Sequence, residues 1–162
     1  SVQFLSDPTA QINTLGLRPD YLQTLEQDEV TNFNEWTIPL GRRFRALKLW
    51  FLLRAYGLNG LRNMIRNHIK WVEDLEEKIN SNPKFKVITN SRLALFTFQY
   101  APVGEDANEA TEVLLKKINN DGTIYLTQTM HEDQFVIRMT AGQFYCTRED
   151  IMTVYDVLEN LT

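Results

Sequence analysis

The sequence predicts an α+β fold, with a mostly antiparallel sheet of about four strands covered by helices and an irregular arm in front of it. Two pairs of strand-like segments alternate with helical segments, in the order α, α, β, β, α, β, β, α after the arm. A hydrophobic fraction of 43% and a charged fraction of 23% are typical of a globular chain. A length of 162 residues is enough to bury a core without disulfide bonds.

Residues 1–40 predict an irregular arm, because prolines interrupt them and no clear apolar period runs through them. Short helical turns are compatible with this arm. Residues 41–56 predict a helix that is apolar on most sides and is therefore buried on most sides. A glycine-containing stretch at 57–60 ends it. Residues 61–79 predict a second, amphipathic helix, which the Asn-Ser-Asn-Pro stretch stops.

The next two elements are predicted strands. Residues 85–89 alternate between apolar and polar side chains, as in a half-buried strand. Residues 93–100 are apolar on both faces, which suits a central strand. Asp106 then predicts the N-cap of a helix that continues to about residue 120.

The last part of the chain predicts a hairpin and a helix. Residues 124–130 and 135–140 are the two strands of the hairpin, with a turn at 131–133. The Thr-Arg-Glu-Asp stretch at 147–150 resembles a capping box with acidic groups in the first turn. A helix from there to the end of the chain completes the predicted fold.

Charge and composition exclude several classes of protein. The net charge is −4 and the pI is about 5.2, whereas a general polyanion binder is basic, so we expect no nucleic-acid partner. No apolar run approaches the ~18 residues of a membrane span, and no signal peptide is visible. A single cysteine, Cys146, excludes an internal disulfide framework and favours a reducing compartment, so we expect a cytoplasmic protein. The chain begins with Ser rather than Met, so we expect a processed start or a piece of a longer chain.

A run of basic residues without any acidic residue occupies positions 41–70. It is either an anion site or a solvated face that pairs with acidic neighbours such as Glu73 and Asp74. The arginines at the start of the predicted helix favour a partner or ligand, because the helix dipole disfavours cations there. The basic residues are Arg42, Arg43, Arg45, Lys48, Arg54, Arg62, Arg66 and Lys70.

The residue types that most often carry chemistry are scarce. His68 lies on the apolar face of its predicted helix, which favours a packed histidine, and His131 falls in the predicted turn. The two histidines have no third ligand at metal-binding spacing, so no metal site is expected. Cys146 has no base beside it in the sequence. From these residues alone we therefore expect no self-sufficient active site.

One segment carries a resemblance. Residues 36–51, W-T-I-P-L-G-R-R-F-R-A-L-K-L-W-F, continue as L-R-A-Y-G at 53–57. This string closely resembles a signature of the group II pyridoxal-phosphate-dependent amino-acid decarboxylases, in the aromatic-L-amino-acid and tyrosine decarboxylase branch. The resemblance covers about residues 18–162. It implies the small C-terminal α+β domain of a fold type I enzyme, together with the loop that leads into it.

The resemblance implies a homodimeric enzyme that releases CO₂ from aromatic L-amino acids to give aryl amines. The arm at 1–40 then includes a mobile catalytic-loop segment, residues 41–80 form a helical connection and dimer interface, and residues 81–162 form the C-terminal domain. The cofactor lysine of the family lies in a His-Lys pair, and no such pair occurs here. Pyridoxal 5′-phosphate is therefore expected on the large upstream domain, with this segment inactive alone.

The resemblance also assigns site residues. Tyr21, in R-P-D-Y-L, matches a loop tyrosine that protonates the substrate Cα after CO₂ leaves; the alternative is an exposed loop tyrosine. Leu40 and Gly41 match positions that line the substrate pocket of the partner subunit, although Gly41 also suits a helix start. Arg42 and Arg43 are expected to support the dimer interface. Arg138 is expected to pair with an acidic group of the large domain, without a catalytic role.

Two other functions remain open at this point. A phenylalanine at the position of Tyr21 marks the aldehyde synthases of the same family, so Tyr21 favours simple decarboxylation over aldehyde synthesis. A stand-alone α+β interaction or RNA-binding module would use the basic helices at 41–70. The acidic remainder of the chain argues against that module.

Overall fold

The computed structural model describes residues 3–16, 31–38 and 43–162. The chain divides into two compact units, Ser1–Leu52 and Leu53–Thr162. The first unit contains the helix α1, Pro8–Leu15, the short 3-10 helix η2, Phe33–Trp36, and the first turns of α2, Ala46–Asn80.

Helix α1 is more regular than the sequence prediction of an irregular arm indicates. Asp7 is its N-cap, and the Asp7 side chain accepts a hydrogen bond of 2.9 Å from the backbone N–H of Thr9. Pro8 occupies the first helical position, where its missing N–H costs nothing. The helix ends where the N–H of Gly16 donates to the carbonyl of Ile12 at 2.7 Å.

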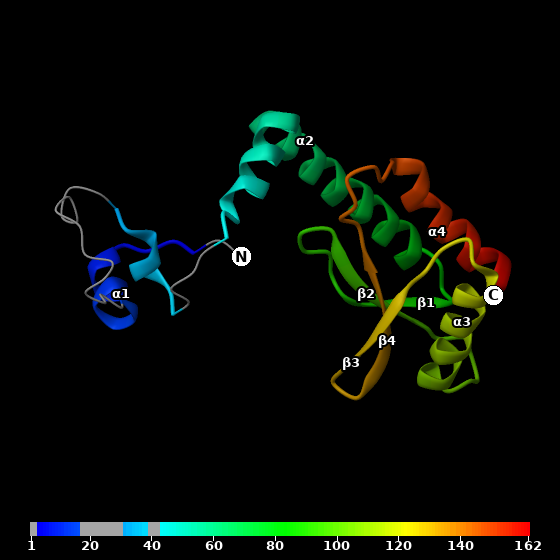
Figure 1. Ribbon diagram of the computed structural model, residues 1–162. Helices are drawn as coiled ribbons and strands as arrows, with labels where there is room; N and C mark the ends of the chain where they lie inside the picture. Colours follow the sequence, from blue (N-terminus) through cyan, green and yellow to red (C-terminus); the bar gives the residue numbers. More distant parts are fainter. Residues whose placement is uncertain (1–2, 17–30, 39–42) are drawn as a thin grey trace. The chain divides into compact units, whose positions relative to one another are not determined.

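The second unit is built on a four-stranded antiparallel sheet in the order β1-β2-β4-β3 (Figure 1). The strands are β1, Phe85–Thr89; β2, Leu95–Tyr100; β3, Thr127–His131; and β4, Gln134–Thr140. Strands β2 and β4 occupy the centre, and β1 and β3 the edges. The sequence prediction of an α+β fold with about four antiparallel strands is therefore confirmed.

The core lies on one face of this sheet. The register brings Phe96 opposite Met139 and Phe98 opposite Ile137, so these four side chains share a face. They belong to one buried cluster with residues of α2, of α3, Ala107–Asp121, and of α4, Arg148–Leu161. The helical members of the cluster are Val72, Leu75, Ile79, Leu114, Leu115, Ile118, Ile151, Val154, Tyr155, Val157 and Leu158.

Helix α2 bends at Gly57, whose φ of 66° and ψ of 162° are not helical. An L side chain rarely adopts this backbone conformation, and glycine does so without steric cost. The helix resumes directly after Gly57 and continues through Gly60. The predicted break over four residues is thus a kink at one residue.

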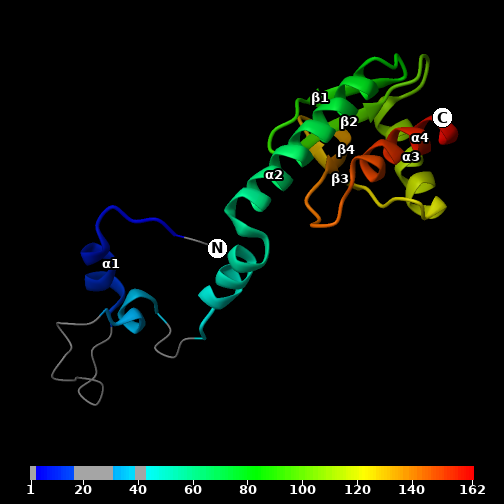
Figure 2. The same cartoon turned by 90° about the horizontal axis from the view of Figure 1, so that it is seen from above.

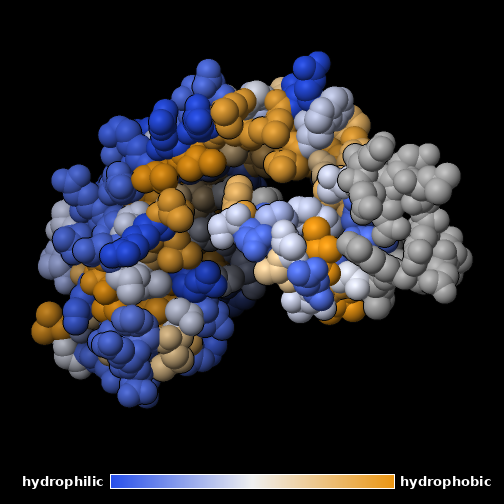
Figure 3. Space-filling view, turned by 90° about the vertical axis from the view of Figure 1, so that its left-hand side faces the viewer, coloured by the Kyte–Doolittle hydropathy of each residue, from blue (hydrophilic) through white to orange (hydrophobic). Residues whose placement is uncertain are grey.

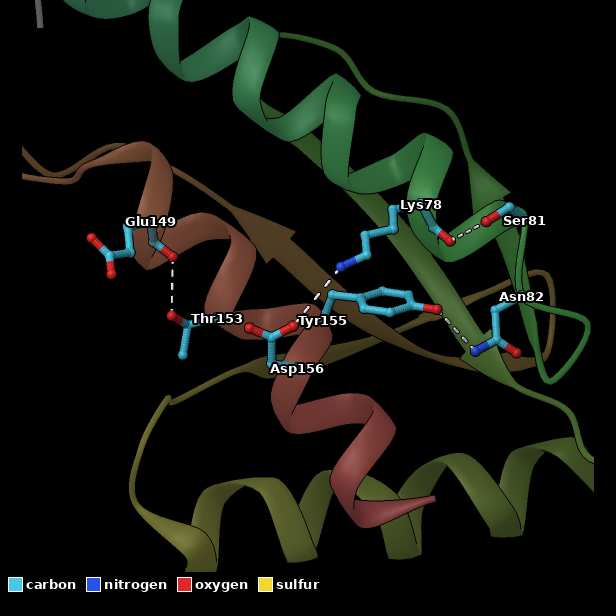
Figure 4. Close-up of polar contacts among 7 residues, drawn as sticks. All are labelled: Lys78, Ser81, Asn82, Glu149, Thr153, Tyr155 and Asp156. Carbon is cyan, nitrogen blue, oxygen red and sulfur yellow. Dashed lines mark hydrogen bonds and ion pairs between the residues drawn. The ribbon is translucent and has the colours of Figure 1, made fainter.

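Helices α2 and α4 lie side by side over the sheet (Figures 1 and 2). Asn82, just after α2, donates to the hydroxyl of Tyr155 at 3.2 Å. The Nζ of Lys78 lies 4.0 Å from the centre of the Tyr155 ring and 3.8 Å from a carboxylate oxygen of Asp156 (Figure 4). The aromatic ring of Tyr155 therefore links the two helices through its face and its hydroxyl.

Local signals fix the ends of α3 and α4. The carboxylate of Asp106 accepts from the backbone N–H groups of Asn108 and Glu109, which confirms the predicted N-cap. The predicted capping box is also present, because Thr147 and Asp150 bond to each other's backbone N–H. None of the helices in the described ranges is both long enough and apolar enough to cross a membrane.

Candidate functional site

The three site residues that the sequence indicates, Tyr21, Leu40 and Gly41, lie outside the described residues, as does Arg42. The structure describes their neighbours on both sides. Tyr21 belongs to residues 17–30, which start directly after α1 and its cap and end shortly before η2.

The two elements that flank Tyr21 in the chain contact each other. The Nε2 of Gln11, in α1, donates to the carbonyl of Trp36, in η2, at 2.7 Å. Within η2, the rings of Phe33 and Trp36 lie 5.9 Å apart, and Glu35 is only 6% exposed. The sequence prediction of an irregular arm missed this contact, although Asp7-Pro8 is a recognisable helix start.

Residues 43–45 come shortly after Leu40 and Gly41 and form a turn before α2. The N–H of Arg45 donates to the carbonyl of Arg43 at 2.7 Å, and α2 begins only at Ala46. The prediction of a helix that already includes Arg43 and Arg45 was therefore wrong. Arg45 directly precedes Ala46, so it still lies at the positive end of the helix dipole, where a cation is disfavoured unless a partner is present.

An open depression of about 520 Å³ lies at this turn. Its lining consists of two arginines, two phenylalanines and an alanine: Arg43, Arg45, Phe44, Phe33 and Ala46. The surface combines positive charge with aromatic area. Such a surface suits an acidic or aromatic partner group.

The first part of α2 exposes its apolar side chains. The sequence predicts a helix buried on most sides, but in this chain Trp50 is 53% exposed and Phe51 is 56% exposed. Apolar side chains gather along the top of Figure 3, where the kinked part of α2 lies. The exposed apolar residues are Leu47, Leu49, Trp50, Phe51, Leu52, Leu53, Tyr56 and Leu58. Exposed apolar area on this scale is typical of an interaction surface.

No lysine of this chain is placed to hold pyridoxal phosphate. Every lysine lies in the described ranges and is exposed. Lys70, for example, lies 3.7 Å from Asp74 on the surface of α2, and Lys116 pairs with Glu112 on α3. A Schiff-base lysine needs an enclosed, desolvated site, and the described residues of this chain do not form such a site around any of these lysines.

The histidines and the cysteine take structural positions. His68 is buried, with its ring 5.7 Å from that of Trp71, which confirms a packed histidine. His131 ends β3 beside a turn at Glu132 and Asp133. No cluster of three metal-binding side chains occurs among the residues that the structure describes.

Cys146 is half-buried, and burial is the main cause that raises the pKa of its thiol. The negative charge of Asp150 raises this pKa further. Because the thiolate is the reactive form of cysteine, both effects oppose nucleophilic reactivity at neutral pH.

Arg138 lies in the central strand β4, with Thr97 and Thr127 as its cross-strand neighbours. Its side chain is half-buried. No carboxylate in the described ranges forms an ion pair with it. A half-buried guanidinium favours an anionic partner, and the described part of the chain does not supply one.

An aromatic cluster adjoins the kink of α2. The rings of Tyr56 and Phe144 lie 4.9 Å apart. A hydrogen bond with Tyr145 is the largest of the effects that raise the pKa of Tyr56. No local sequence signal indicates this cluster, since the contact joins α2 to a loop almost 90 residues away.

Comparison with known proteins agrees with this geometry. A family model described as the pyridoxal-dependent decarboxylase conserved domain matches residues 1–101. The chain therefore belongs to the pyridoxal-dependent decarboxylase family, as the resemblance at residues 36–51 indicated.

Particular relatives extend the match over nearly the whole chain. Tyrosine decarboxylase 2 of Arabidopsis thaliana is 33% identical over 96% of this chain and 30% of its own length. The crystal structure of Oryza sativa TDC with PLP and tryptamine matches 93% of this chain and 32% of that chain, with a TM-score of 0.85 and 28% identity.

The crystal structure of Rhodiola rosea 4-hydroxyphenylacetaldehyde synthase matches 97% of this chain and 32% of that chain, with a TM-score of 0.81 and 26% identity. This chain thus spans about a third of the length of these relatives. The α+β fold of residues 53–162 is accordingly the fold of a part of such enzymes.

Proposed function

We propose that this chain is the C-terminal part of a pyridoxal-phosphate-dependent enzyme that converts aromatic L-amino acids to aryl amines and CO₂. The family match over residues 1–101 carries this proposal, because the matched range includes Tyr21 and the string at 36–51. The names of the relatives, tyrosine decarboxylase and TDC with tryptamine, support the aromatic substrate class. When bound, the cofactor takes up the electron pair left by the departing CO₂.

The role of this chain is to deliver a proton. The phenol of Tyr21 donates it to the substrate Cα once CO₂ has left, as a positioned general acid does. The lysines of this chain are all exposed. Because the His-Lys pair of the family does not occur in this chain, we assign the amine that holds the cofactor to the upstream part of the enzyme.

The exposed face of α2 supports a partner surface. Apolar side chains from Leu47 to Leu58 are open to solvent in this chain, and Arg43 and Arg45 lie beside them in the sequence. We assign this surface to the large domain and the second subunit of a homodimer. Leu40 and Gly41 then line part of the substrate pocket of the neighbouring subunit.

Arg138 receives a carboxylate from outside this segment. Its half-buried guanidinium has no acidic partner in the described ranges, and its backbone is paired within β4. We assign an acidic group of the large domain as that partner. If Arg138→Gln in the complete enzyme lowers stability without a change in KM, the partner is a protein carboxylate; a rise in KM with unchanged stability contradicts this assignment.

The test uses the full-length protein that contains this segment, purified with and without added pyridoxal phosphate. We expect cofactor absorbance, CO₂ release from tyrosine, dopa or tryptophan, and a dimer in sedimentation. Tyr21→Phe should lower amine formation at least about 100-fold while cofactor absorbance persists. Tyr125→Phe removes an exposed phenol elsewhere in the chain and should change nothing. A full-length protein that binds no pyridoxal phosphate would refute the proposal.

Aldehyde synthesis is a second candidate, since the Rhodiola rosea aldehyde synthase has the same fold over 97% of this chain. The two functions differ in product, an amine in one and an aldehyde in the other. Because Tyr21 supplies a proton donor, we expect amine as the main product of the wild-type enzyme. Aldehyde as the main product would show that the enzyme is an aldehyde synthase and not a simple decarboxylase.

A further inference from the structure

We propose that the free edge of β3 pairs, in antiparallel orientation, with β3 of a second copy of this chain. The strand β3, Thr127–His131, forms one edge of the four-stranded sheet (Figure 1). Pairing there joins the sheets of two copies into one continuous sheet. This interface is separate from the exposed apolar face of α2, and it does not depend on the proposed enzymatic function.

The two edges of the sheet differ in their protection against pairing. Edge strands of natural proteins often carry charges, prolines or bulges that block the approach of another strand. The strand β1 has an exposed lysine, Lys86, and a register shift between Val87 and Thr89. In contrast, β3 pairs with β4 through five residues without a shift, and its sequence, T-Q-T-M-H, contains no carboxylate, lysine, arginine or proline. The edge at β3 therefore lacks each of these protections.

Backbone hydrogen bonding in β3 alternates between its two sides. The chain turns at residues 132–133, which both have positive φ, and His131 pairs with Gln134 across this two-residue turn. In such a hairpin the pair next to the turn is hydrogen-bonded, so His131 and every second residue before it bond to β4. The residues in between, Gln128 and Met130, direct their N–H and C=O groups away from the sheet.

The open part of this edge has a defined length. The outward N–H and C=O groups of Gln128 and Met130 have no hydrogen-bond partner within residues 3–16, 31–38 and 43–162. The next outward residue, Leu126, is already satisfied, because the Asn119 side chain accepts from its N–H at 3.0 Å and donates to its carbonyl at 3.1 Å. The turn closes the other end. A partner strand therefore has only Gln128 and Met130 to bond with.

This length selects one register for two copies of β3. If Gln128 lies opposite Met130 of the second copy, two-fold symmetry also sets Met130 opposite Gln128, and every outward group gains a partner. Thr129 then faces its own counterpart on the two-fold axis, as a pair without backbone hydrogen bonds. A register centred on Gln128 would instead bring Met130 opposite Leu126, whose backbone groups Asn119 occupies. A register centred on Met130 would bring Gln128 opposite the turn.

The side chains of β3 favour a second copy as the partner. None of them is a carboxylate, a lysine or an arginine, so self-pairing brings no like charges together, and His131 faces Thr127 of the second copy. Thr129 faces Thr129, which is a favourable cross-strand pair. Met130 is 59% exposed and is covered by Gln128 of the second copy. The strand is thus complementary to itself in the same register that satisfies its backbone.

Disulfide trapping tests this register in the 162-residue chain, with its single cysteine removed by Cys146→Ser. Thr129→Cys places two thiols across the axis, where Cα atoms about 4.5 Å apart lie within the range of about 4.4–6.8 Å that a disulfide spans. Thr127→Cys is the matched control, because Thr127 is exposed on the same side of the same strand. In the proposed register the two copies of Thr127 are at least about 13 Å apart, at ~3.3 Å per residue.

After mild oxidation at equal protein concentration, Thr129→Cys should give at least about tenfold more disulfide-linked dimer than Thr127→Cys. A ratio near one would indicate random collision and would overturn the pairing, as would the absence of dimer in both variants. The full-length protein with Thr129→Cys should yield the same disulfide between two peptides that contain position 129. If only the 162-residue chain yields it, another part of the enzyme covers β3, and the proposed interface is wrong.

A charge exchange tests the axis without a covalent bond. Thr129→Lys and Thr129→Glu each set like charges opposite each other, so each variant alone should dimerise at least about fivefold more weakly in sedimentation than the wild-type chain. An equal mixture of the two should recover the dimer. Thr140→Lys, at an exposed position on the interior strand β4, is the control and should dimerise as the wild-type chain does. Unchanged association of the single variants, or no recovery in the mixture, would overturn the proposal.

Discussion

Asn108 is the residue whose removal tests the architecture of residues 53–162 most sharply. Its Oδ1 accepts from the Nε2 of Gln99 at 2.9 Å and from the backbone N–H of Phe135 at 2.8 Å. Its Nδ2 donates to the carbonyl of Asp133 at 3.1 Å. One side chain at the start of α3 therefore joins β2, β4 and the turn between β3 and β4.

The cost of Asn108→Ala follows from these three bonds. Each contributes about 1 kcal/mol net, and an N–H of Phe135 left without a partner adds about 1–3 kcal/mol if water does not reach it. The Nε2 of Gln99 keeps its second acceptor, the carbonyl of Phe135 at 3.1 Å, which limits the loss. We therefore expect a decrease of about 2–4 kcal/mol in the free energy of unfolding.

The assay is urea unfolding of the 162-residue chain, followed by far-UV circular dichroism. Asn120→Ala, at an exposed position in the same helix, is the control, because it makes the same change in helix propensity without these contacts. The midpoint should fall for Asn108→Ala with an unchanged m-value. If the free energies of unfolding of Asn108→Ala and Asn120→Ala agree within about 0.5 kcal/mol, the three hydrogen bonds of Asn108 do not stabilise the fold as expected.

Three further outcomes are expected. Hydrogen bonds from the backbone and hydroxyl of Thr147 lower the pKa of Asp150 from 3.8. The ionised Asp150 therefore stabilises the start of α4 above that value, and this stabilisation is lost as the pH falls through the lower folded-state pKa. Amide exchange in the first turn of α4 should rise over the same pH range in the wild-type chain, but not in Asp150→Ala. Gly57→Ala should destabilise the chain by about 1–3 kcal/mol in urea unfolding, because φ at Gly57 is 66°. Asp156→Asn should change stability by less than about 1 kcal/mol, since its contact with Lys78 is exposed.

Local sequence signals predicted the elements whose ends depend on local chemistry. Asp106 caps α3 and Thr147 with Asp150 caps α4, because a cap needs only side chains within three residues of the helix start. The strand β1 has the predicted bounds, Phe85–Thr89. These elements needed no knowledge of distant contacts.

Elements that depend on distant contacts were predicted less well. The alternating pattern placed the start of β3 at residue 124, whereas the strand begins at Thr127. The side chain of Asn119, from α3, takes both backbone groups of Leu126: it accepts from the N–H at 3.0 Å and donates to the carbonyl at 3.1 Å. These side-chain hydrogen bonds take the place of strand-to-strand hydrogen bonds at Leu126. The sequence pattern within the strand does not indicate them.

For the candidate site too, local sequence predicted some features and distant contacts determined others. The string at 36–51 indicated the family, and the family match confirms it, whereas the roles of Tyr21, Leu40 and Gly41 stay predictions. The hydrogen bond between Gln11 and Trp36 could not be predicted, because it joins side chain and backbone across 25 residues. The exposed apolar face of α2 was predicted as buried, since a sequence shows that a surface is apolar but not which chain covers it.

We propose that this segment supplies the proton donor and that the cofactor amine lies elsewhere in the enzyme. Borohydride treatment of the full-length protein with bound pyridoxal phosphate makes the link between lysine and cofactor permanent, and peptide mapping then locates it. We expect the modified lysine upstream of residue 1 and unmodified Lys48, Lys70 and Lys78. A cofactor attached to any lysine of residues 1–162 would contradict the account.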